Sequence, residues 1–276
     1  MLNAYLARSL NRRSMKKQTV LPLALAAVLG FSACKKELIP GTYESQPVTM
    51  GNGQLTSWIT FNKEGNPTAV GMSLTDGALE GLPDIGSHPS GNDHANIFEV
   101  PLPPTDVTRT PFTHIAVNWN PGGHEPPGIY DKPHFDMHFY IMSSAERKLI
   151  PHYEDDTAKF DNFPPADYLP LNFINPGKGE PAMGAHWIDY YAPELPWNGG
   201  GEFNQTFVYG TYDGKVTFYE PMLTYSFLKN ITEFTRSIPW PAKVQVSGFY
   251  PKQMRVKHAD GVYTISLEEF EHRTAS

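Results

Sequence analysis

Short segments rich in β-branched and aromatic residues, separated by prolines and glycines, run through most of this chain. The 26 prolines and 23 glycines leave almost no stretch long enough to show a helical period. Pairs such as Asp213-Gly214 and Asp260-Gly261 stand between two such segments, which is typical of a β-hairpin. The sequence therefore predicts an all-β fold, an antiparallel sandwich or barrel with long loops and few short helices.

The expected strands follow from these segments and from the turns that bound them. They lie at residues 46–50, 54–61, 67–72, 112–119, 134–142, 206–212, 215–220, 243–249, 253–258 and 262–267. Short helices are expected at residues 144–149 and 224–234. Residues 153–204 are dense in Pro, Gly, Asp and Asn but also carry recurring aromatic residues, which favours long ordered loops over a linker between domains.

The N-terminus has the order of charge and apolar residues that is typical of a secretory signal. Residues 1–33 contain five basic residues and no acidic one, and the apolar run at residues 19–31 ends just before Cys34, the only cysteine. This run of about 13 residues is shorter than the ~20 that cross a bilayer. Its end resembles a bacterial lipobox, so we expect a signal peptide over residues 1–33 and lipid on Cys34. An ordinary cleaved signal with an incidental cysteine is the alternative.

Lipidation would make this an exported protein anchored to a bacterial membrane, on the periplasmic face or at the cell surface. A short tether over residues 34–41 and a single β-rich domain over residues 42–276 would follow. Removing the five basic residues of the signal from the total of 22 leaves 17 against 29 acidic residues, a formal charge of −12. This charge argues against binding to nucleic acid, whereas a homo-oligomer and a small-molecule ligand both remain open.

Residues that can bind a metal or take part in catalysis concentrate in one region, where four of the ten histidines fall between residues 114 and 138. On an extended strand, His134, Asp136, His138 and Tyr140 share one face and the apolar residues between them share the other. Neighbours two positions apart are about 6.5–7 Å apart, a span that two side chains can close around one ion. His134 and His138 are about 13 Å apart on a straight strand, so both bind one ion only from opposite sides or across a bulge.

Other segments can complete such a site, since His186 follows a turn and Glu220 lies at the end of an expected strand. We therefore expect a divalent transition metal, Zn, Fe, Mn or Ni, held by His134, His138, His186 and Glu220. The additional candidates, as ligands or as hydrogen-bond partners of ligands, are His124, Asp136, Glu125 and Tyr140. Each histidine taken alone also fits a hydrogen-bonded structural residue. Five histidines lack such a context and are expected to be surface or structural residues: His88, His94, His152, His258 and His272.

Four motifs carry a family resemblance: Gly123-His-Glu-Pro-Pro-Gly-Ile-Tyr130, Pro133-His-Phe-Asp-Met-His-Phe-Tyr140, Pro181-Ala-Met-Gly-Ala-His-Trp-Ile-Asp189 and Asp213-Gly-Lys-Val-Thr-Phe-Tyr-Glu-Pro-Met222. They resemble an uncharacterised bacterial family of secreted β-rich proteins, from about residue 48 to residue 267. That family implies no activity. A looser resemblance to cupins, which carry a pair of histidines on a barrel strand, would imply a cupin-like or jelly-roll-like barrel, although Asp136 stands at one of the histidine positions.

The sequence is compatible with two functions from different classes. The sequence contains no Gly-x-Ser-x-Gly elbow, no His-Glu-x-x-His helix and no phosphate-binding loop. One function is a metal-dependent enzyme, in which the ion acts as a Lewis acid or activates water, with Tyr140 or Glu125 assisting. The other is a non-catalytic envelope module that binds a ligand or carbohydrate and uses its histidines structurally, with its tryptophans either stacking on that ligand or filling the core.

Overall fold

The computed structural model describes residues 39–84, 96–103 and 109–276. The chain divides into a unit of residues 1–35 and a unit of residues 36–276, and every described residue belongs to the second. The predicted signal peptide and lipidation site at Cys34 lie outside the described residues, as do His88 and His94. Within the described part of the chain, no helix has the length and apolar character needed to cross a membrane.

Seven strands from both ends of the described chain form the first sheet. Their order is β1-β3-β4-β15-β14-β12, and β2 pairs with β3. The bounds are β1 (Gly41–Glu44), β2 (Val48–Met50), β3 (Gly53–Phe61), β4 (Pro67–Thr75), β12 (Glu233–Ser237), β14 (Gln253–Ala259) and β15 (Val262–Glu268).

Seven strands from the middle of the chain form the second sheet, in the order β5-β6-β7-β11-β10-β9-β8. The bounds are β5 (Ile97–Pro101), β6 (His114–Asn120), β7 (His134–Tyr140), β8 (Phe173–Ile174), β9 (Ala185–Asp189), β10 (Gln205–Tyr212) and β11 (Lys215–Thr224). A separate pair joins β13 (Gly248–Tyr250) to β16 (Glu271–Arg273). All pairs between described strands are antiparallel.

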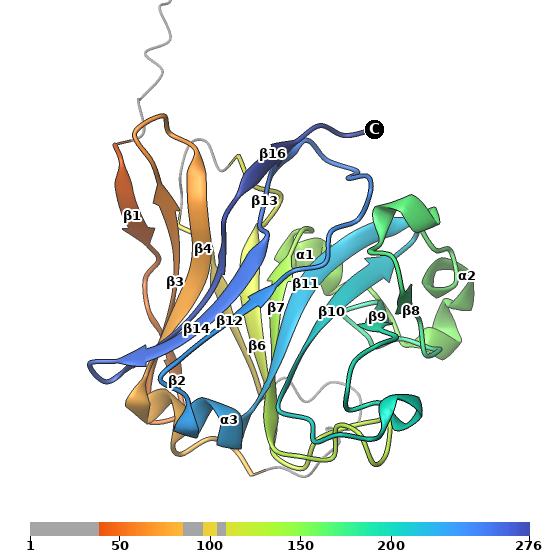
Figure 1. Ribbon diagram of the computed structural model, residues 1–276, viewed down its shortest axis with the longest axis horizontal. Coiled ribbons are helices and arrows are strands. Elements are labelled where there is room, and N and C mark those ends of the chain that lie inside the picture. The colour runs from red at the N-terminus through yellow and green to blue at the C-terminus, as the bar shows by residue number, and fades with distance from the viewer. Residues whose placement is uncertain (1–38, 85–95, 104–108) are drawn as a thin grey trace, which may run out of the picture. The chain divides into compact units, whose positions relative to one another are not determined.

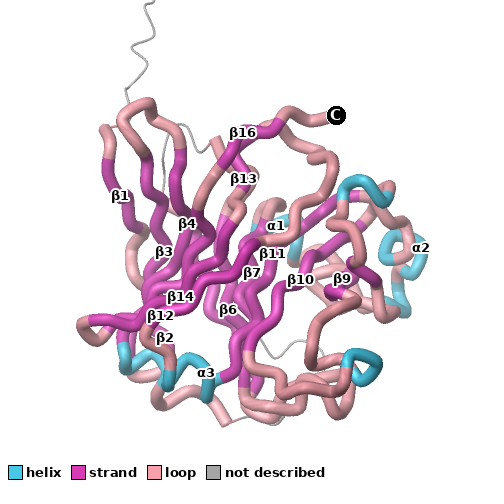
Figure 2. Tube along the Cα trace, viewed as in Figure 1, coloured by secondary structure: helices cyan, strands magenta, loops and turns pink. Residues whose placement is uncertain are grey.

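The two sheets pack as a sandwich, in which the first sheet forms one layer, β6 and β7 lie behind it, and β11 and β10 continue the second sheet to the right of the view (Figure 1; Figure 2). Apolar side chains that alternate along strands of both sheets form one core, including Leu55, Val70 and Ile265 from the first and Val117 and Phe139 from the second. The described strands form no closed barrel. The predicted all-β antiparallel fold is therefore confirmed as a sandwich.

Helices in the described residues are short and lie at the ends of strands or in loops. They are α1 (Ser144–Arg147), α2 (Thr157–Phe160) and α3 (Tyr225–Asn230), with single 3₁₀ turns η1 (Asp76–Leu79), η3 (Tyr153–Asp155), η4 (Ala166–Tyr168) and η5 (Pro196–Asn198). Ser143 and Glu146 form a reciprocal capping box at the start of α1. The helix predicted at residues 224–234 is shorter than expected: α3 ends at Asn230, and β12 begins at Glu233.

The hairpin turns agree with their sequence signals. Asp213 and Gly214 have positive φ angles of 47° and 73° between paired Tyr212 and Lys215, and Asp260 and Gly261 have 52° and 79° between Ala259 and Val262. The predicted strand at residues 243–249 is wrong over most of its length, because only Gly248–Tyr250 forms a strand there.

The outer face of the second sheet is covered as well. A second apolar cluster joins sheet residues such as Tyr140, Phe218 and Met222 to Tyr130, Leu195 and Phe203, which come from the loops around residues 121–133 and 190–204. These loops bury side chains that would otherwise face solvent on the outer side of β7 and β11. The polar residues of β7 therefore point into a covered space between sheet and loops.

Candidate metal centre

Every residue of β7 is buried, although the strand alternates polar and apolar side chains. Phe135, Met137 and Phe139 lie in the sandwich core. His134, Asp136 and His138 point to the opposite, loop-covered face and are exposed by 0%, 5% and 0%. Burying three such polar groups on one face is costly unless each is paired or liganded.

Within residues 39–84, 96–103 and 109–276, two groups of three side chains have the ligand types and spacing that could hold a metal ion, and each contains two histidines and one carboxylate. The Asp136 group consists of His124, His134 and Asp136, and the Glu220 group consists of His138, His186 and Glu220. Within each group the ligand atoms lie within 4.8 Å of one another. Each group thus brings together side chains from separate strands or loops.

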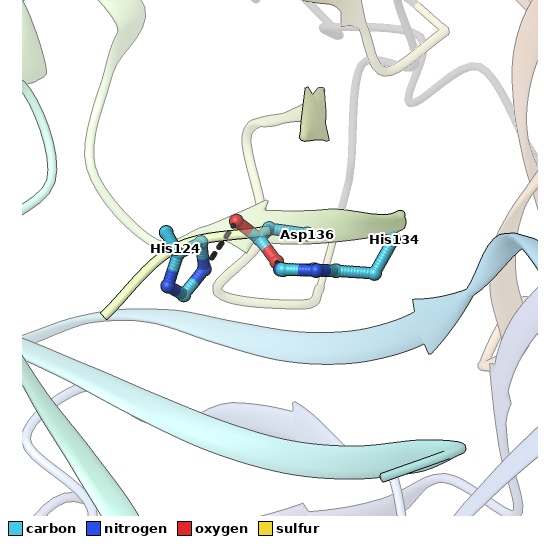
Figure 3. Close-up of side chains that lie close together, drawn as sticks. All are labelled: His124, His134 and Asp136. Atoms are coloured by element: carbon cyan, nitrogen blue, oxygen red, sulfur yellow. Dashed lines mark ion pairs between the residues drawn. The ribbon is translucent and has the colours of Figure 1, made fainter. Parts of the chain in front are cut away.

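In the Asp136 group, the carboxylate of Asp136 lies between the two histidines (Figure 3). His124 Nε2 is 3.3 Å from Asp136 Oδ2, and His134 Nε2 is 3.1 Å from Asp136 Oδ1. The other ring nitrogens face backbone oxygens: His134 Nδ1 is 2.6 Å from Lys132 O, and His124 Nδ1 is 2.7 Å from Glu125 O. Because a carbonyl oxygen only accepts, both Nδ1 atoms donate.

Asn120, at the end of β6 opposite His134, holds this carboxylate from a third side. Its Nδ2 donates to Asp136 Oδ2 at 2.7 Å and lies 3.3 Å from His134 Nε2. Burial alone would raise the pKa of Asp136, but the charges and hydrogen bonds of His134 and His124 outweigh it and keep the pKa well below its usual value. Burial likewise opposes ionisation of His124, yet the Asp136 charge raises the pKa of His124 to about 9.

The Glu220 group is assembled from three strands of the second sheet: β7 and β11, which are neighbours, and β9, which is separated from β11 by β10. Phe218 pairs with Tyr140 and Met222 with Asp136, which sets Glu220 of β11 beside His138 of β7. His138 Nε2 is 3.5 Å from Glu220 Oε1, and His186 Nε2 is 3.7 Å from Glu220 Oε2. The carboxylate of Glu220 thus faces a histidine with each of its oxygens.

Gly210 makes room for this arrangement. His186 of β9 pairs with Gly210 of β10, which in turn pairs with Phe218 of β11. A Cβ at Gly210 would lie 2.1 Å from the Phe218 ring. The absence of a side chain lets that ring lie over β10, with its centroid 4.7 Å from that of His138 and 5.2 Å from that of His186.

The polar atoms of the Glu220 group are buried and unsatisfied. Among the described residues, His138 Nδ1, His138 Nε2 and Glu220 Oε2 have no hydrogen-bond partner. Burial, followed by the charge of Asp136, raises the pKa of Glu220 well above its usual value. Burial lowers the pKa of His138 to about 3 and that of His186 to about 4. Without an ion, both histidines are therefore neutral at pH 7, and burial favours the neutral form of Glu220.

Tyr130 and Tyr140 border the two groups in different ways. The Tyr130 hydroxyl is buried and without a hydrogen-bond partner among the described residues. Burial and then the charges of Glu194, Glu220 and Asp136 raise its pKa, so the hydroxyl is neutral, and the Tyr130 ring lies 5.9 Å from that of His124 between centroids. The Tyr140 hydroxyl donates to Ala182 O at 3.3 Å, and its ring is stacked on that of His138, 5.3 Å between centroids.

The predicted ligands are thus divided between the two groups. His134 lies in one and His138 in the other, whereas His138, His186 and Glu220 meet as expected. Glu125 contributes its backbone oxygen to His124. His258 pairs with Asp76 at 2.8 Å, outside both groups. Sequence reasoning missed Asn120, although it shares the face of His114 on β6, and it missed Tyr130 and Gly210, whose roles depend on contacts across the sheet.

A comparison with protein families matched the family described as TTHB210-like, hypothetical protein TTHB210, over residues 62–119. This stretch runs from the turn before β4 to the end of β6 and includes none of the six residues of the two groups. Comparisons with curated proteins and with solved structures found no match. The similarity is therefore to an uncharacterised family and gives the site no assigned chemistry.

Proposed function

We propose that this protein is an exported, lipid-anchored protein of the bacterial envelope that binds a divalent transition metal through His138, His186 and Glu220. The observation that carries the metal site is the set of unsatisfied atoms in the Glu220 group. His138 Nε2 and Glu220 Oε2 are buried, face the same small space and lack hydrogen bonds within the described residues. Leaving such groups unpaired costs about 1–3 kcal/mol each, which coordination to a cation would offset.

The spacing of the ligand atoms is suited to an ion. Ligands about 2.1 Å from a tetrahedral metal lie roughly 3.4 Å from each other. The separations of 3.5 and 3.7 Å between Glu220 and the two histidines are close to this value. Two imidazoles and one carboxylate favour Zn, Fe(II), Mn or Ni over Ca and Mg, which prefer oxygen ligands.

Three protein ligands leave at least one coordination position open, as in catalytic rather than structural zinc sites. An ion bound there would act as a Lewis acid or lower the pKa of a bound water. Tyr130 is the residue best suited to assist, because its buried hydroxyl lacks a hydrogen-bond partner within the described chain. Tyr140, whose hydroxyl already donates to Ala182, would hold the His138 ring by stacking.

Metal analysis of the full-length protein, purified in detergent without a histidine tag, tests the site. We expect Zn²⁺ to remain bound after dialysis, and Glu220→Gln to weaken binding by more than the 10–100-fold that loss of a ligand's hydrogen-bond partner costs. His258→Ala is the matched control, because His258 also faces a carboxylate but lies outside the group. Equal Zn²⁺ affinity in Glu220→Gln and wild type would overturn the assignment.

A cavity elsewhere in the fold favours a second function, the capture of a small molecule. It has a volume of about 580 Å³, within the range of ligand sites. Its walls are mainly apolar, from Ile141, Val216, Val244 and Tyr250, and Lys159, Lys215 and Lys243 also line it. None of the six residues of the two histidine groups lines it. A protein that folds normally and binds no transition metal would favour this function.

A further inference from the structure

We infer that the Asp136 group is a second, separate metal site, so that the outer face of the second sheet holds two divalent cations side by side. The first support is the orientation of its histidines. His124 Nδ1 and His134 Nδ1 donate to Glu125 O and Lys132 O, at 2.7 and 2.6 Å. With both Nδ1 atoms donating, each Nε2 is left facing an oxygen of Asp136. Such a contact is favourable only with a proton or a metal cation between the nitrogen and the oxygen, and the cation takes this place when it is present.

This pattern is the one that metal-binding histidines normally show, since a ligating imidazole usually donates its other N–H to a backbone carbonyl or a carboxylate. The carboxylate is prepared in the same way. Asn120 Nδ2 donates to Asp136 Oδ2 at 2.7 Å, whereas Asp136 Oδ1 faces His134 Nε2 at 3.1 Å. Asp136 Oδ1 therefore points into the space between the histidines, where it can coordinate an ion, and Asn120 fixes that direction.

The distances again suit a small cation. The two Nε2 atoms are 3.3 and 3.1 Å from the oxygens of Asp136, close to the roughly 3.4 Å between ligands of a tetrahedral ion. With two nitrogens and one oxygen, the site would take Zn, Fe(II), Mn or Ni and reject Mg and Ca.

The loop that carries His124 completes this site. His134 and Asp136 are buried, whereas the side chain of His124 is 30% exposed and gives an ion its way in. His124 N donates to Tyr130 O at 3.2 Å, which closes the loop on itself. The Tyr130 and Phe203 rings contact each other, and Phe203 also contacts His134, with centroids 4.9 and 5.4 Å apart. These contacts hold His124 over Asp136.

The two sites are neighbours but share no ligand. Asp136 and His138 are two positions apart on β7, about 6.5–7 Å along the strand. Each site has its own carboxylate, so each can lose its ion while the other keeps one. Because like charges repel, the second ion should bind more weakly than the first.

This inference is tested by the number of Zn²⁺ ions bound per chain of the full-length protein in detergent. The visible absorption spectrum of the Co²⁺-loaded protein is a second readout. We expect two ions per chain in wild type and in His258→Ala, one in Asp136→Asn, one in Glu220→Gln and none in the double variant. If Asp136→Asn fails to fold, His124→Ala decides, because the exposed loop tolerates the change. It should weaken one site at least tenfold and leave the other intact.

The outcomes separate this inference from the proposed function. One ion per chain that Glu220→Gln removes, and that His124→Ala and Asp136→Asn leave unchanged, would overturn the second site alone. One ion that Asp136→Asn removes and Glu220→Gln leaves unchanged would support the second site and overturn the first. Two sites that bind Mg²⁺ as tightly as Zn²⁺ would overturn the ligand chemistry argued for both.

Discussion

Among single residues, the two carboxylates on this face have pKa values that are shifted in opposite directions. The pKa of Asp136 lies well below its usual value because two histidines face it, whereas burial raises the pKa of Glu220 well above its usual value. His138 and His186, with pKa values lowered to about 3 and about 4, are already neutral at pH 5. Protons therefore compete with a metal in the Glu220 group mainly at the carboxylate, not at the imidazoles.

A prediction on pH follows from the direction of these shifts. Between pH 5 and the raised pKa of Glu220, metal binding at this group must displace the carboxyl proton, so affinity should rise about tenfold per pH unit. Titration calorimetry in buffers of different ionisation enthalpy should show about one proton released per ion at the Glu220 group. It is measured in His124→Ala, which weakens the other site but keeps the Asp136 charge that also raises the pKa of Glu220. Affinity that is independent of pH between 5 and 6 would contradict a protonated Glu220.

The same pKa shifts lower the free energy of unfolding of the metal-free protein as the pH falls, through the histidines, and as the pH rises, through Glu220. As the pH drops from 6.5 towards 4, unfolded histidines bind protons that buried His138 and His186 do not, which favours unfolding. As the pH rises above 4.5, unfolded Glu220 ionises while the folded carboxyl stays protonated, which also favours unfolding. Bound metal removes the second loss, because it stabilises the ionised carboxylate in the folded state.

Gly210→Ala is predicted to damage both the fold and the Glu220 group. The new Cβ would lie 2.1 Å from the Phe218 ring, which must move against His138 and His186. Overpacking of this kind lowers the free energy of unfolding by about 1–3 kcal/mol. The midpoint temperature of thermal unfolding should fall by about 2–4 °C for each kcal/mol lost. Zn²⁺ affinity should fall with it. Gly201→Ala is the control for Zn²⁺ affinity, which it should leave unchanged, because its Cβ would meet Pro193 O at 3.0 Å and Gly201 lies outside both histidine groups.

The candidate site was partly predictable from the sequence. Alternation along a strand places His134, Asp136 and His138 on one face, because side chains two positions apart point the same way. The division into two groups was not predictable, since it depends on where the loop with His124 folds back and on the register that brings His186 to Gly210. Neither is a property of the local sequence.

At the scale of elements, hairpins with strong turn signals were predicted closely and irregular segments were not. The segment at residues 243–249 has an alternating apolar pattern, which predicts a strand. Val244 is buried but lies in a loop, and only Gly248–Tyr250 forms a strand, which pairs with β16. Residues 224–234 begin as helix α3 because the Thr224 hydroxyl accepts from Phe227 N. The β-branched residues after Asn230 then favour an extended strand, and β12 pairs with β14.

Strand β9 illustrates how an element can link a loop region to the site. It lies within residues 153–204, where the sequence predicts ordered loops, and its residue His186 belongs to the Glu220 group. Further along the same segment, Tyr191 and Trp197 are 62% and 52% exposed. The segment therefore combines an anchored strand with exposed residues that a protease can reach.

Limited proteolysis with chymotrypsin should cut first after Tyr191 or Trp197, because exposed loop backbone opens most readily. Zn²⁺ should slow this cleavage, since an ion holding His186 to Glu220 fixes β9 against the sheet. The protection should disappear in Glu220→Gln and persist in His258→Ala. A first cut within β6, β7 or β11 would contradict the view that these strands form the rigid support of the site.

At the scale of the whole molecule, the loop layer over the second sheet turns a two-sheet sandwich into a scaffold with a polar interior. Apolar residues of both sheets fill one core, and the opposite face of the second sheet carries the histidines beneath Tyr130, Leu195 and Phe203. The sandwich supplies rigidity and the loops exclude water, conditions under which electrostatic interactions with an ion are strong. An all-β sandwich was predictable from the turn pattern, but the loop layer over its second sheet was not.

The last prediction concerns the lipid anchor, which rests on the sequence before Cys34. In a bacterial host that processes lipoproteins, wild type should incorporate labelled fatty acid and sediment with membranes, and detergent rather than high salt should release it, because inserted acyl chains are held by the hydrophobic effect and salt screens only charges. Cys34→Ala should lose the label and move to the soluble or unprocessed fraction. Since Cys34 is remote in sequence from both histidine groups, the variant should still bind Zn²⁺ as wild type does. Undiminished labelling of Cys34→Ala would end the lipoprotein assignment and leave the metal sites standing.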